Sequence, residues 1–170
     1  VYRCINRLDR DTTGALILAK NPLSAAILSV QMKKRQILRT YLALVDGLLP
    51  DSGTINAPIA RMEGSVITRE VNFGTGESAI THYERLAAGK EYSLAELHLE
   101  TGRTHQIRVH MKYIGHPLPG DYLYNPDYRR INRQPLHSYQ LEFTHPTPER
   151  SCFLLLRFPL ISFLPFIAIL

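Results

Sequence analysis

Three short stretches of this 170-residue sequence combine an aspartate, a tyrosine and arginines in a way that could support acid–base or nucleophilic chemistry. Asp9 lies in NRLDRDTTG, Tyr41 in RTYLALVDG, and Arg108 in TGRTHQIRVH. A carboxylate can attack carbon or accept a proton, a nearby arginine keeps it ionised, and a tyrosine can stack on a flat ring or assist proton transfer. Taken singly, these residues are more often a turn residue, a core tyrosine and a surface cation. Only their combination predicts a site.

The cationic residues are mostly arginines, which favours nucleic acid as a partner. The sequence holds 20 lysines and arginines against 15 aspartates and glutamates, a net charge of +5, and 15 of those cations are arginines. Arginine pairs with phosphates through two hydrogen bonds and stacks on planar bases. The basic stretches KKRQILR, GRTHQIR and RRINR lie near the candidate chemical residues. An excess of this size also occurs in proteins that bind no nucleic acid, so charge alone decides little.

The sequence lacks the usual signatures of metals and nucleotide cofactors. Its two cysteines, Cys4 and Cys152, are far apart and stand in no metal-ligand spacing. Its seven histidines show no H-E-x-x-H pattern, and there is no glycine-rich phosphate loop. We therefore expect chemistry without a metal or a cofactor. With no secretory signal, we expect a cytoplasmic protein.

Two helices are predicted to help position these residues. Asn21 as cap and Pro22 at the first turn start a helix over 22–35. Its buried face is predicted to consist of Leu23, Ala26, Ile27 and Val30. A second helix over 104–115 is predicted to begin with Thr104 as cap and to end at Gly115. Its apolar face consists of Ile107, Met111 and Ile114.

The rest of the chain reads mainly as strands. Apolar runs and alternating patterns predict strands over 15–20, 37–47, 66–73, 79–88, 91–100 and 136–146, an extended connector over 53–58 and a loop over 116–135. Because short glycine-containing turns separate several of these strands, neighbours should pair antiparallel. We predict the α+β class, with a mixed, largely antiparallel sheet and flanking helices.

The three motifs, in this order and spacing, resemble those of the RluA-type (RluA/RluC/RluD-like) RNA pseudouridine synthases. That family has the patterns H-R-L-D-x-x-T-S-G, K-x-Y-x-A-x-V-x-G and T-G-R-x-H-Q-I-R-x-H, the last followed by G-x-P-x-x-G-D-x-x-Y. Here the last part reads ETGRTHQIRVHMKYIGHPLPGDYLY, residues 100–124, and the resemblance covers about residues 2–148. It implies isomerisation of specific uridines to pseudouridine in structured RNA, without a cofactor.

The resemblance also assigns roles to individual residues. It implies that Asp9 is the catalytic aspartate, Tyr41 the active-site tyrosine and Arg108 the arginine that pairs with Asp9. It implies that Arg7 helps to hold RNA around a base turned out of its stack. The further RNA-binding candidates are Arg103, His105 and Gln106, although His105 and Gln106 could equally be helix residues that fix the loop geometry.

The family resemblance leads to expectations about partners, and the sequence departs from the family pattern at two positions. The expected partner is ribosomal RNA, or alternatively transfer RNA, and the protein is expected to act as a monomer away from membranes. An alternative is an inactive RNA-binding remnant of such an enzyme. Asn6 replaces the usual histidine, which predicts weaker stacking on RNA, and Arg39 replaces a common lysine.

Two segments are expected from composition and resemblance. Residues 1–150 form a catalytic domain that looks shortened at its N-terminus, because the family has further strands ahead of its aspartate motif. Residues 151–170 form a hydrophobic tail in which only Arg157 is charged. We interpret the tail as the product of a frameshift rather than as a membrane anchor, since it holds an arginine and two prolines.

Overall fold

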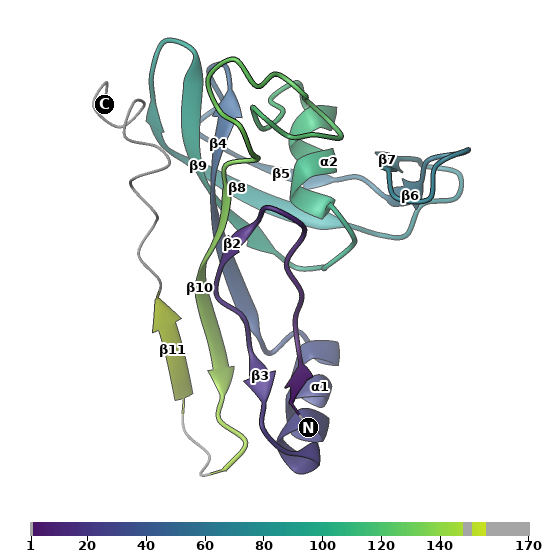
Figure 1. Ribbon diagram of the computed structural model, residues 1–170, viewed down its shortest axis with the longest axis vertical. Helices are drawn as coiled ribbons and strands as arrows, with labels where there is room; N and C mark the ends of the chain where they lie inside the picture. Colours follow the sequence, from purple (N-terminus) through teal and green to yellow (C-terminus); the bar gives the residue numbers. More distant parts are fainter. Residues whose placement is uncertain (1, 148–150, 156–170) are drawn as a thin grey trace.

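A twisted sheet with one helix against each end of its inner face dominates the computed structural model, which describes residues 2–147 and 151–155 (Figure 1). Strands β11, β10, β4, β9, β8 and β5 lie side by side in this order, and every neighbouring pair is antiparallel. The elements in chain order are β1 (Arg3–Cys4), β2 (Thr13–Gly14), β3 (Leu18–Ala19), α1 (Pro22–Lys33), β4 (Leu38–Asp46), β5 (Ser52–Asn56), β6 (Ile59–Arg61), β7 (Arg69–Val71), β8 (Ile80–Ala88), β9 (Tyr92–Leu99), α2 (Gln106–Tyr113), β10 (Leu136–Thr144) and β11 (Ser151–Leu155).

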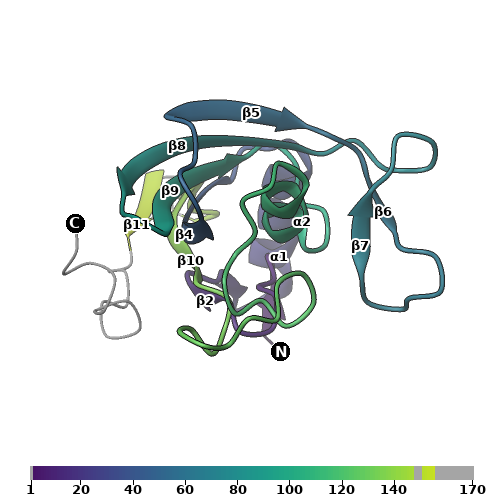
Figure 2. The same ribbon diagram turned by 90° about the horizontal axis from the view of Figure 1, so that it is seen from above.

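The sheet is mixed because β2 pairs in parallel with β10 while the remaining pairs are antiparallel. Two small pairs, β1 with β3 and β6 with β7, lie outside it. Seen from above, the sheet curves around α2, and the β6–β7 hairpin projects away from the body (Figure 2). The predicted α+β class, with a largely antiparallel sheet and flanking helices, is confirmed.

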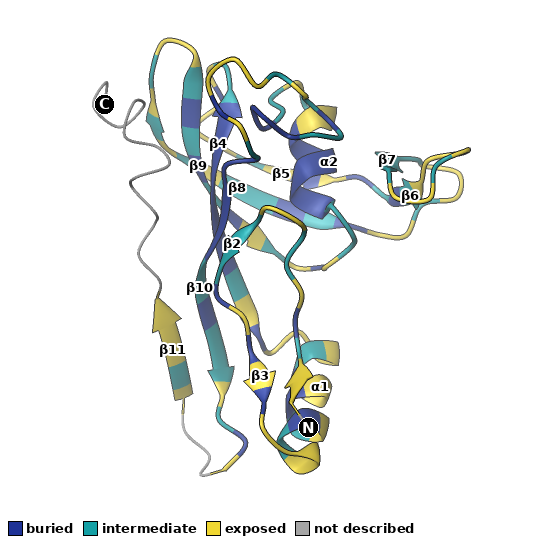
Figure 3. Cartoon of the chain, in the orientation of Figure 1, coloured by how far each residue is buried: buried dark blue, intermediate teal, exposed yellow. Residues whose placement is uncertain are grey.

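The main core forms between the sheet and α2. Tyr41, Ala43 and Val45 alternate along β4 and share one face of the sheet, where they join Ile107 and Met111 of α2 in a single buried cluster. Figure 3 shows this helix as the most buried one. The predicted apolar face of the second helix is therefore confirmed. Because this face packs against the sheet, the directions of the other side chains on α2 are fixed.

The first helix starts where it was predicted to start, but it ends at Lys33 rather than at residue 35, and it has a different buried face. Asn21 caps it as expected, since its side chain accepts a hydrogen bond from the Ser24 amide at 2.8 Å. Leu23 and Val30 were predicted to be buried, yet they are 63% and 48% exposed. The residues that are buried instead are Ala25, Leu28 and Gln31.

Gln31 explains why the prediction of that face was wrong. Its amide Nε2 donates to the carbonyl of Thr144 at 2.8 Å, and its Oε1 accepts from the Thr144 amide at 3.1 Å. A polar side chain thus acts as the partner that the end of β10 lacks beyond its last pair with β4, and it turns the helix so that Ala25 and Leu28 pack inward. A count of apolar residues alone misses such a contact.

Several boundaries also differ from the prediction. The connector predicted over 53–58 overlaps β5, which pairs along its whole length with β8. The second helix begins at Gln106 with His105, not Thr104, at its cap position. The strand predicted over 66–73 is reduced to β7.

Part of the predicted tail belongs to the sheet. Residues Ser151–Leu155 form β11, which pairs antiparallel with the outer half of β10. The remainder of the predicted tail, residues 156–170, lies outside the described residues. Within the part of the chain that the structure describes, no helix has the length and apolar character needed to cross a membrane.

Gly14 allows the loop that carries Asp9 to lie directly against β10. Its φ is +114°, and a Cβ atom placed there would lie 2.2 Å from the carbonyl oxygen of Ser138. Because both the dihedral angle and the contact with a backbone atom exclude a side chain, only glycine fits. Gly14 therefore holds β2 in parallel register with β10.

We expect Gly14→Ala to lower the free energy of unfolding by at least about 2 kcal/mol, because the new methyl group forces β2 away from β10. Urea unfolding would measure the loss. Gly115→Ala is the matched control, since Gly115 also has a positive φ, +85°, but no atom lies within 4 Å of its added Cβ. Equal losses in the two variants would contradict the proposed collision.

Candidate active site

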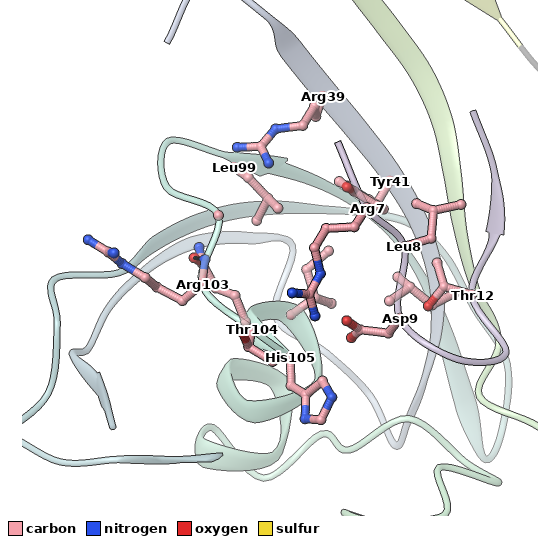
Figure 4. A pocket seen from close by; sticks show the side chains of 14 residues that line it. Arg7, Leu8, Asp9, Thr12, Arg39, Tyr41, Leu99, Arg103, Thr104 and His105 are labelled. Atoms are coloured by element: carbon pink, nitrogen blue, oxygen red, sulfur yellow. Dashed lines mark hydrogen bonds between the residues drawn. The ribbon is translucent and has the colours of Figure 1, made fainter. Parts of the chain in front are cut away.

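The three sequence motifs meet around one cavity of about 140 Å³ (Figure 4). Its walls come from the loop after β1, from β4 and from the turn that leads into α2. Six of the seven predicted site residues line it, and the seventh, Arg108, contacts Asp9. The lining residues are Arg7, Leu8, Asp9, Thr12, Arg39, Tyr41, Leu99, Gly102, Arg103, Thr104, His105, Gln106, Ile107 and Leu136.

The loop carrying Asp9 is closed by the side chain of Asn6. Its Oδ1 accepts from the Ile17 amide at 2.8 Å and its Nδ2 donates to the Ala15 carbonyl at 3.4 Å, so the amide joins the two ends of the loop. Asn6 is only 6% exposed. Residue 6 faces the interior in this structure, and the weaker stacking on RNA expected from the replacement of histidine stays a prediction.

The far side of the same loop is fastened to the segment before β10. Gln134 donates from Nε2 to the Arg10 carbonyl at 2.9 Å and to the Thr12 hydroxyl at 2.8 Å. The Thr13 hydroxyl lies 2.8 Å from Nδ1 of His137. Asp9 is thus placed by contacts at both ends of its loop, while its own carboxylate remains 19% exposed.

Arg108 bridges two aspartates. Its Nη1 lies 3.4 Å from Oδ2 of Asp9, as the resemblance implies. Its stronger partner is Asp121, which accepts from Nε and Nη2 at 2.7 Å each, and both of these side chains are fully buried. Asp121 was not among the predicted site residues. The sequence signal was present in GDYLY, where it is the aspartate that follows Gly120.

The charge of Arg108 is secured despite its burial. Burial alone would lower its pKa, but hydrogen bonds and charge from Asp121, with a smaller effect of Asp9, raise the pKa of Arg108 well above its ordinary value. The guanidinium also lies over two aromatic rings, 5.2 Å from Tyr122 and 5.0 Å from Tyr124. A permanent positive charge therefore faces the Asp9 carboxylate.

Tyr41 contributes a flat ring on the opposite wall. It is 6% exposed, and burial is the main reason why the pKa of its hydroxyl is raised, with the negative charge of Asp9 acting in the same direction. The hydroxyl is accordingly protonated at neutral pH. Its position in the cavity suits stacking on a ring that enters beside Asp9.

Two predicted RNA-binding residues are occupied by protein contacts. Gln106 is 3% exposed, and its amide accepts from Thr101 and the Arg103 backbone while donating to Ile80 and Thr81. Its hydrogen-bonding capacity is used up, so its role here is to fix the turn into α2. The Arg103 side chain pairs with Glu77 and with the Ser78 carbonyl and points away from the cavity (Figure 4).

Arg7 and Arg39 are the cations that remain over the cavity. Arg7 is exposed and reaches toward the space above Asp9 (Figure 4). Arg39 donates from Nη2 to the Thr101 carbonyl at 3.2 Å and lines a second, larger cavity of about 520 Å³ that adjoins the first. A positively charged surface thus continues from the Asp9 cavity toward the end of α1.

His110 anchors α2 from inside the core. Its ring is fully buried, with Nδ1 2.9 Å from the Thr81 hydroxyl and Nε2 2.9 Å from the Ala57 carbonyl. A carbonyl only accepts, so Nε2 carries the proton and the Thr81 hydroxyl donates to Nδ1. Burial lowers the pKa of His110, although the bond to Ala57 opposes this. The folded protein therefore holds His110 neutral.

We expect the protein to lose stability as the pH falls below about 6.5, the pKa of an unperturbed histidine. In that range the unfolded chain binds a proton at residue 110 that the folded chain does not, so acid favours unfolding. Urea unfolding at pH 7.5 and 5.5 would measure this. The His110→Gln variant should lose about 1 kcal/mol less between the two pH values than the unaltered chain. An identical loss in both proteins would show that another group is responsible.

The fold and the cavity define an α+β domain whose site joins an accessible carboxylate, a buried arginine and a tyrosine. The family model described as RNA pseudouridylate synthase matches residues 1–113. The chain therefore belongs to the RNA pseudouridylate synthase family, and the family prediction made from the three motifs is confirmed.

Individual relatives agree with this assignment. The uncharacterized RNA pseudouridine synthase YhcT of Bacillus subtilis is 47% identical over 147 residues, which cover 85% of this chain and 48% of the relative. The ribosomal large subunit pseudouridine synthase D of Nitrosomonas europaea is 45% identical over 151 residues, covering 84% of this chain and 44% of the relative. The chain thus spans about half the length of the curated relatives that it matches.

A solved structure shares the fold. Human RNA pseudouridylate synthase domain containing 1 superimposes with a TM-score of 0.83 at 31% identity, over 94% of this chain and 70% of that one. Human RNA pseudouridylate synthase domain containing 4 superimposes with a TM-score of 0.78, and at 23% identity it bears on the fold alone.

Proposed function

We propose that this chain isomerises specific uridines to pseudouridine in structured RNA, with Asp9 as the catalytic group and without a cofactor. The observation that carries the proposal is the accessible Asp9 carboxylate, held in a cavity beside the permanently charged Arg108. Large-subunit ribosomal RNA is the first candidate substrate, because a relative at 45% identity bears the name ribosomal large subunit pseudouridine synthase D. We further propose that the protein acts as a monomer in the cytoplasm.

The reaction needs few groups. The bond between N1 of the uracil and C1′ of the ribose breaks, the base turns, and C5 bonds to C1′, after which the proton on C5 leaves and N1 is protonated. There is no net oxidation. Asp9 supplies the anionic oxygen for attack or proton abstraction, and the positively charged Arg108 lies 3.4 Å from it. Tyr41 stacks on the base, since its raised pKa leaves it as a neutral ring.

A uridine that is stacked within an RNA helix cannot enter a cavity of this size. The cavity, about 140 Å³, is smaller than the roughly 300–1,000 Å³ of sites that enclose a drug-sized ligand, so it suits a single base. The uridine must be turned out of its stack, and the protein must hold the neighbouring phosphates. The exposed guanidinium of Arg7 is the group best placed for that task.

The test is to incubate the chain with in vitro transcribed ribosomal and transfer RNA and to map pseudouridine by carbodiimide-based primer extension. New stops at defined uridines support the proposed function. Tight binding to the same RNAs without any modification would instead identify an inactive RNA-binding remnant.

RNA binding should weaken steeply as the salt concentration rises, because phosphate contacts release counterions. We expect Arg7→Gln to weaken binding and to reduce the slope of log affinity against log salt by about 1. Arg103→Gln should have a smaller effect, since that side chain already pairs with Glu77. Lys90→Gln, at the exposed turn between β8 and β9, is the control expected to change nothing. Binding that is independent of salt would remove the argument for phosphate contacts.

A further inference from the structure

His105 is held in an unusual backbone conformation at the rim of the cavity. It lines the cavity, and its φ of +57° lies in the left-handed region, where histidine is tolerated better than most residues. The side chain of a residue in this conformation leaves the turn in a direction that a helical residue could not reach.

Tyr124 determines which nitrogen of His105 carries the proton. The Tyr124 hydroxyl accepts a hydrogen bond from the Arg69 amide at 2.9 Å, and it lies 2.9 Å from Nδ1 of His105. Tyr124 is only 6% exposed, and no other acceptor for its hydroxyl proton occurs among the described residues. The hydroxyl must therefore donate to Nδ1, because a buried donor without an acceptor is costly. The proton of a neutral His105 ring then sits on Nε2.

The second ring nitrogen is free to contact a ligand. Nε2 of His105 has no hydrogen-bond partner in the described part of the chain, and it is not among the buried atoms that lack one, so it is open to solvent. Burial lowers the pKa of His105, and the positive charge of Arg108 acts in the same direction, although Asp9 opposes them. At neutral pH the ring thus presents a neutral N–H group to solvent at the rim of the cavity.

We propose that His105 donates a hydrogen bond from Nε2 to a carbonyl oxygen of the uracil that enters the cavity, and that Tyr124 is the positioning residue that fixes this tautomer. This rests on the proposed function. A base carbonyl is the favoured acceptor because the cavity is of the size of a single base and because Arg7 is available for phosphate. His105 then serves specificity, since it holds the base during the reaction while Asp9 acts on it.

The tautomer is tested without any activity. Long-range proton–nitrogen NMR correlation on the ¹⁵N-labelled chain at pH 7.5 distinguishes a protonated Nε2 from a protonated Nδ1. We expect Nε2–H in the unaltered chain and a mixture of both tautomers in Tyr124→Phe, which loses the hydroxyl but keeps the ring. A proton on Nδ1 in the unaltered chain would overturn the proposal.

The acceptor is tested with pentauridylate as the probe. Its addition should shift the Nε2–H signal, and replacing a carbonyl oxygen of the uracils by sulfur, in 2-thio and 4-thio versions, should diminish that shift in one of the two. A signal that responds only to phosphorothioate linkages would assign the contact to phosphate and overturn the base-carbonyl claim. These NMR measurements can be made even if the chain forms no pseudouridine. Failure of the proposed function can therefore be distinguished from failure of the proposed contact.

A matched pair of variants tests whether the donor at residue 105 affects the rate of RNA modification. His105→Gln places an amide N–H near the position of Nε2, whereas His105→Met has a similar shape without a donor, and both bear the same cost of the left-handed backbone. We expect the methionine variant to modify RNA about tenfold more slowly than the glutamine variant. Equal rates would show that the donor plays no part.

Discussion

Replacing Asp9 by asparagine is expected to abolish pseudouridine formation, lowering the rate by at least about a thousandfold. The amide has nearly the same size and can still accept a hydrogen bond, but it lacks the anionic oxygen needed to attack carbon or take a proton. Stability should change by only about 1 kcal/mol, because Arg108 keeps its two bonds to Asp121. Pseudouridine mapping on transcribed ribosomal RNA would measure the rate, and urea unfolding the stability.

Asp11→Asn is the matched control for this experiment. Asp11 lies in the same loop, its side chain is 36% exposed, and it does not line the cavity. Its backbone has a φ of +68°, a conformation that asparagine adopts readily. The control should therefore keep its activity. Full modification by the Asp9→Asn protein would show that Asp9 is a turn residue only, and the proposed mechanism would be wrong.

Replacing Arg108 by methionine should both remove activity and lower the free energy of unfolding by about 3–5 kcal/mol. Among the described residues, the substitution leaves the fully buried Asp121 side chain with only the amides of Leu123 and Tyr124 as donors, at 3.0 and 3.2 Å. An unpaired buried carboxylate costs far more than the loss of a surface ion pair. Urea unfolding, compared with that of the unaltered chain, would give the difference.

A double variant separates stability from chemistry. Arg108→Met with Asp121→Asn removes both charges and keeps a side-chain oxygen for the two amides, so most of the lost stability should return. Activity should stay absent, because nothing then faces the Asp9 carboxylate with a positive charge. If the double variant remained as unstable as Arg108→Met alone, the buried charge would not be the cause of the instability.

The sequence predicts the sheet and α2 well because both follow a simple period. Buried and half-buried residues alternate along most of β9, and apolar residues recur every turn along α2, whereas the apolar run 41–45 of β4 is buried on both faces. Asp9, Tyr41 and Arg108 were predicted from motifs that resemble those of the family; Asp9 and Tyr41 line one cavity, and Arg108 contacts Asp9. Periodicity and motifs thus carry the central part of the fold and the location of the site.

The missed features depend on single polar contacts between distant segments. Gln31 turns α1 by bonding to Thr144, Asn6 closes the Asp9 loop, and Asp121 holds Arg108. None of these contacts has a periodic signal, because each joins one side chain to a single backbone group or charge, between 11 and 113 residues away in sequence. The folded arrangement reveals the contacts of Gln31 and Asn6, whereas Asp121 was also marked in the sequence by GDYLY.

The pairing of β2 with β10 has a consequence for protein synthesis. Thr13 and His137 are in contact although 124 residues separate them in sequence. At translation rates of about 5–20 residues per second, the segment with the aspartate leaves the ribosome some 6–25 s before its partner strand. A chain that terminates early therefore carries the aspartate motif without the strand that sets its position, and we expect such products to be inert toward RNA.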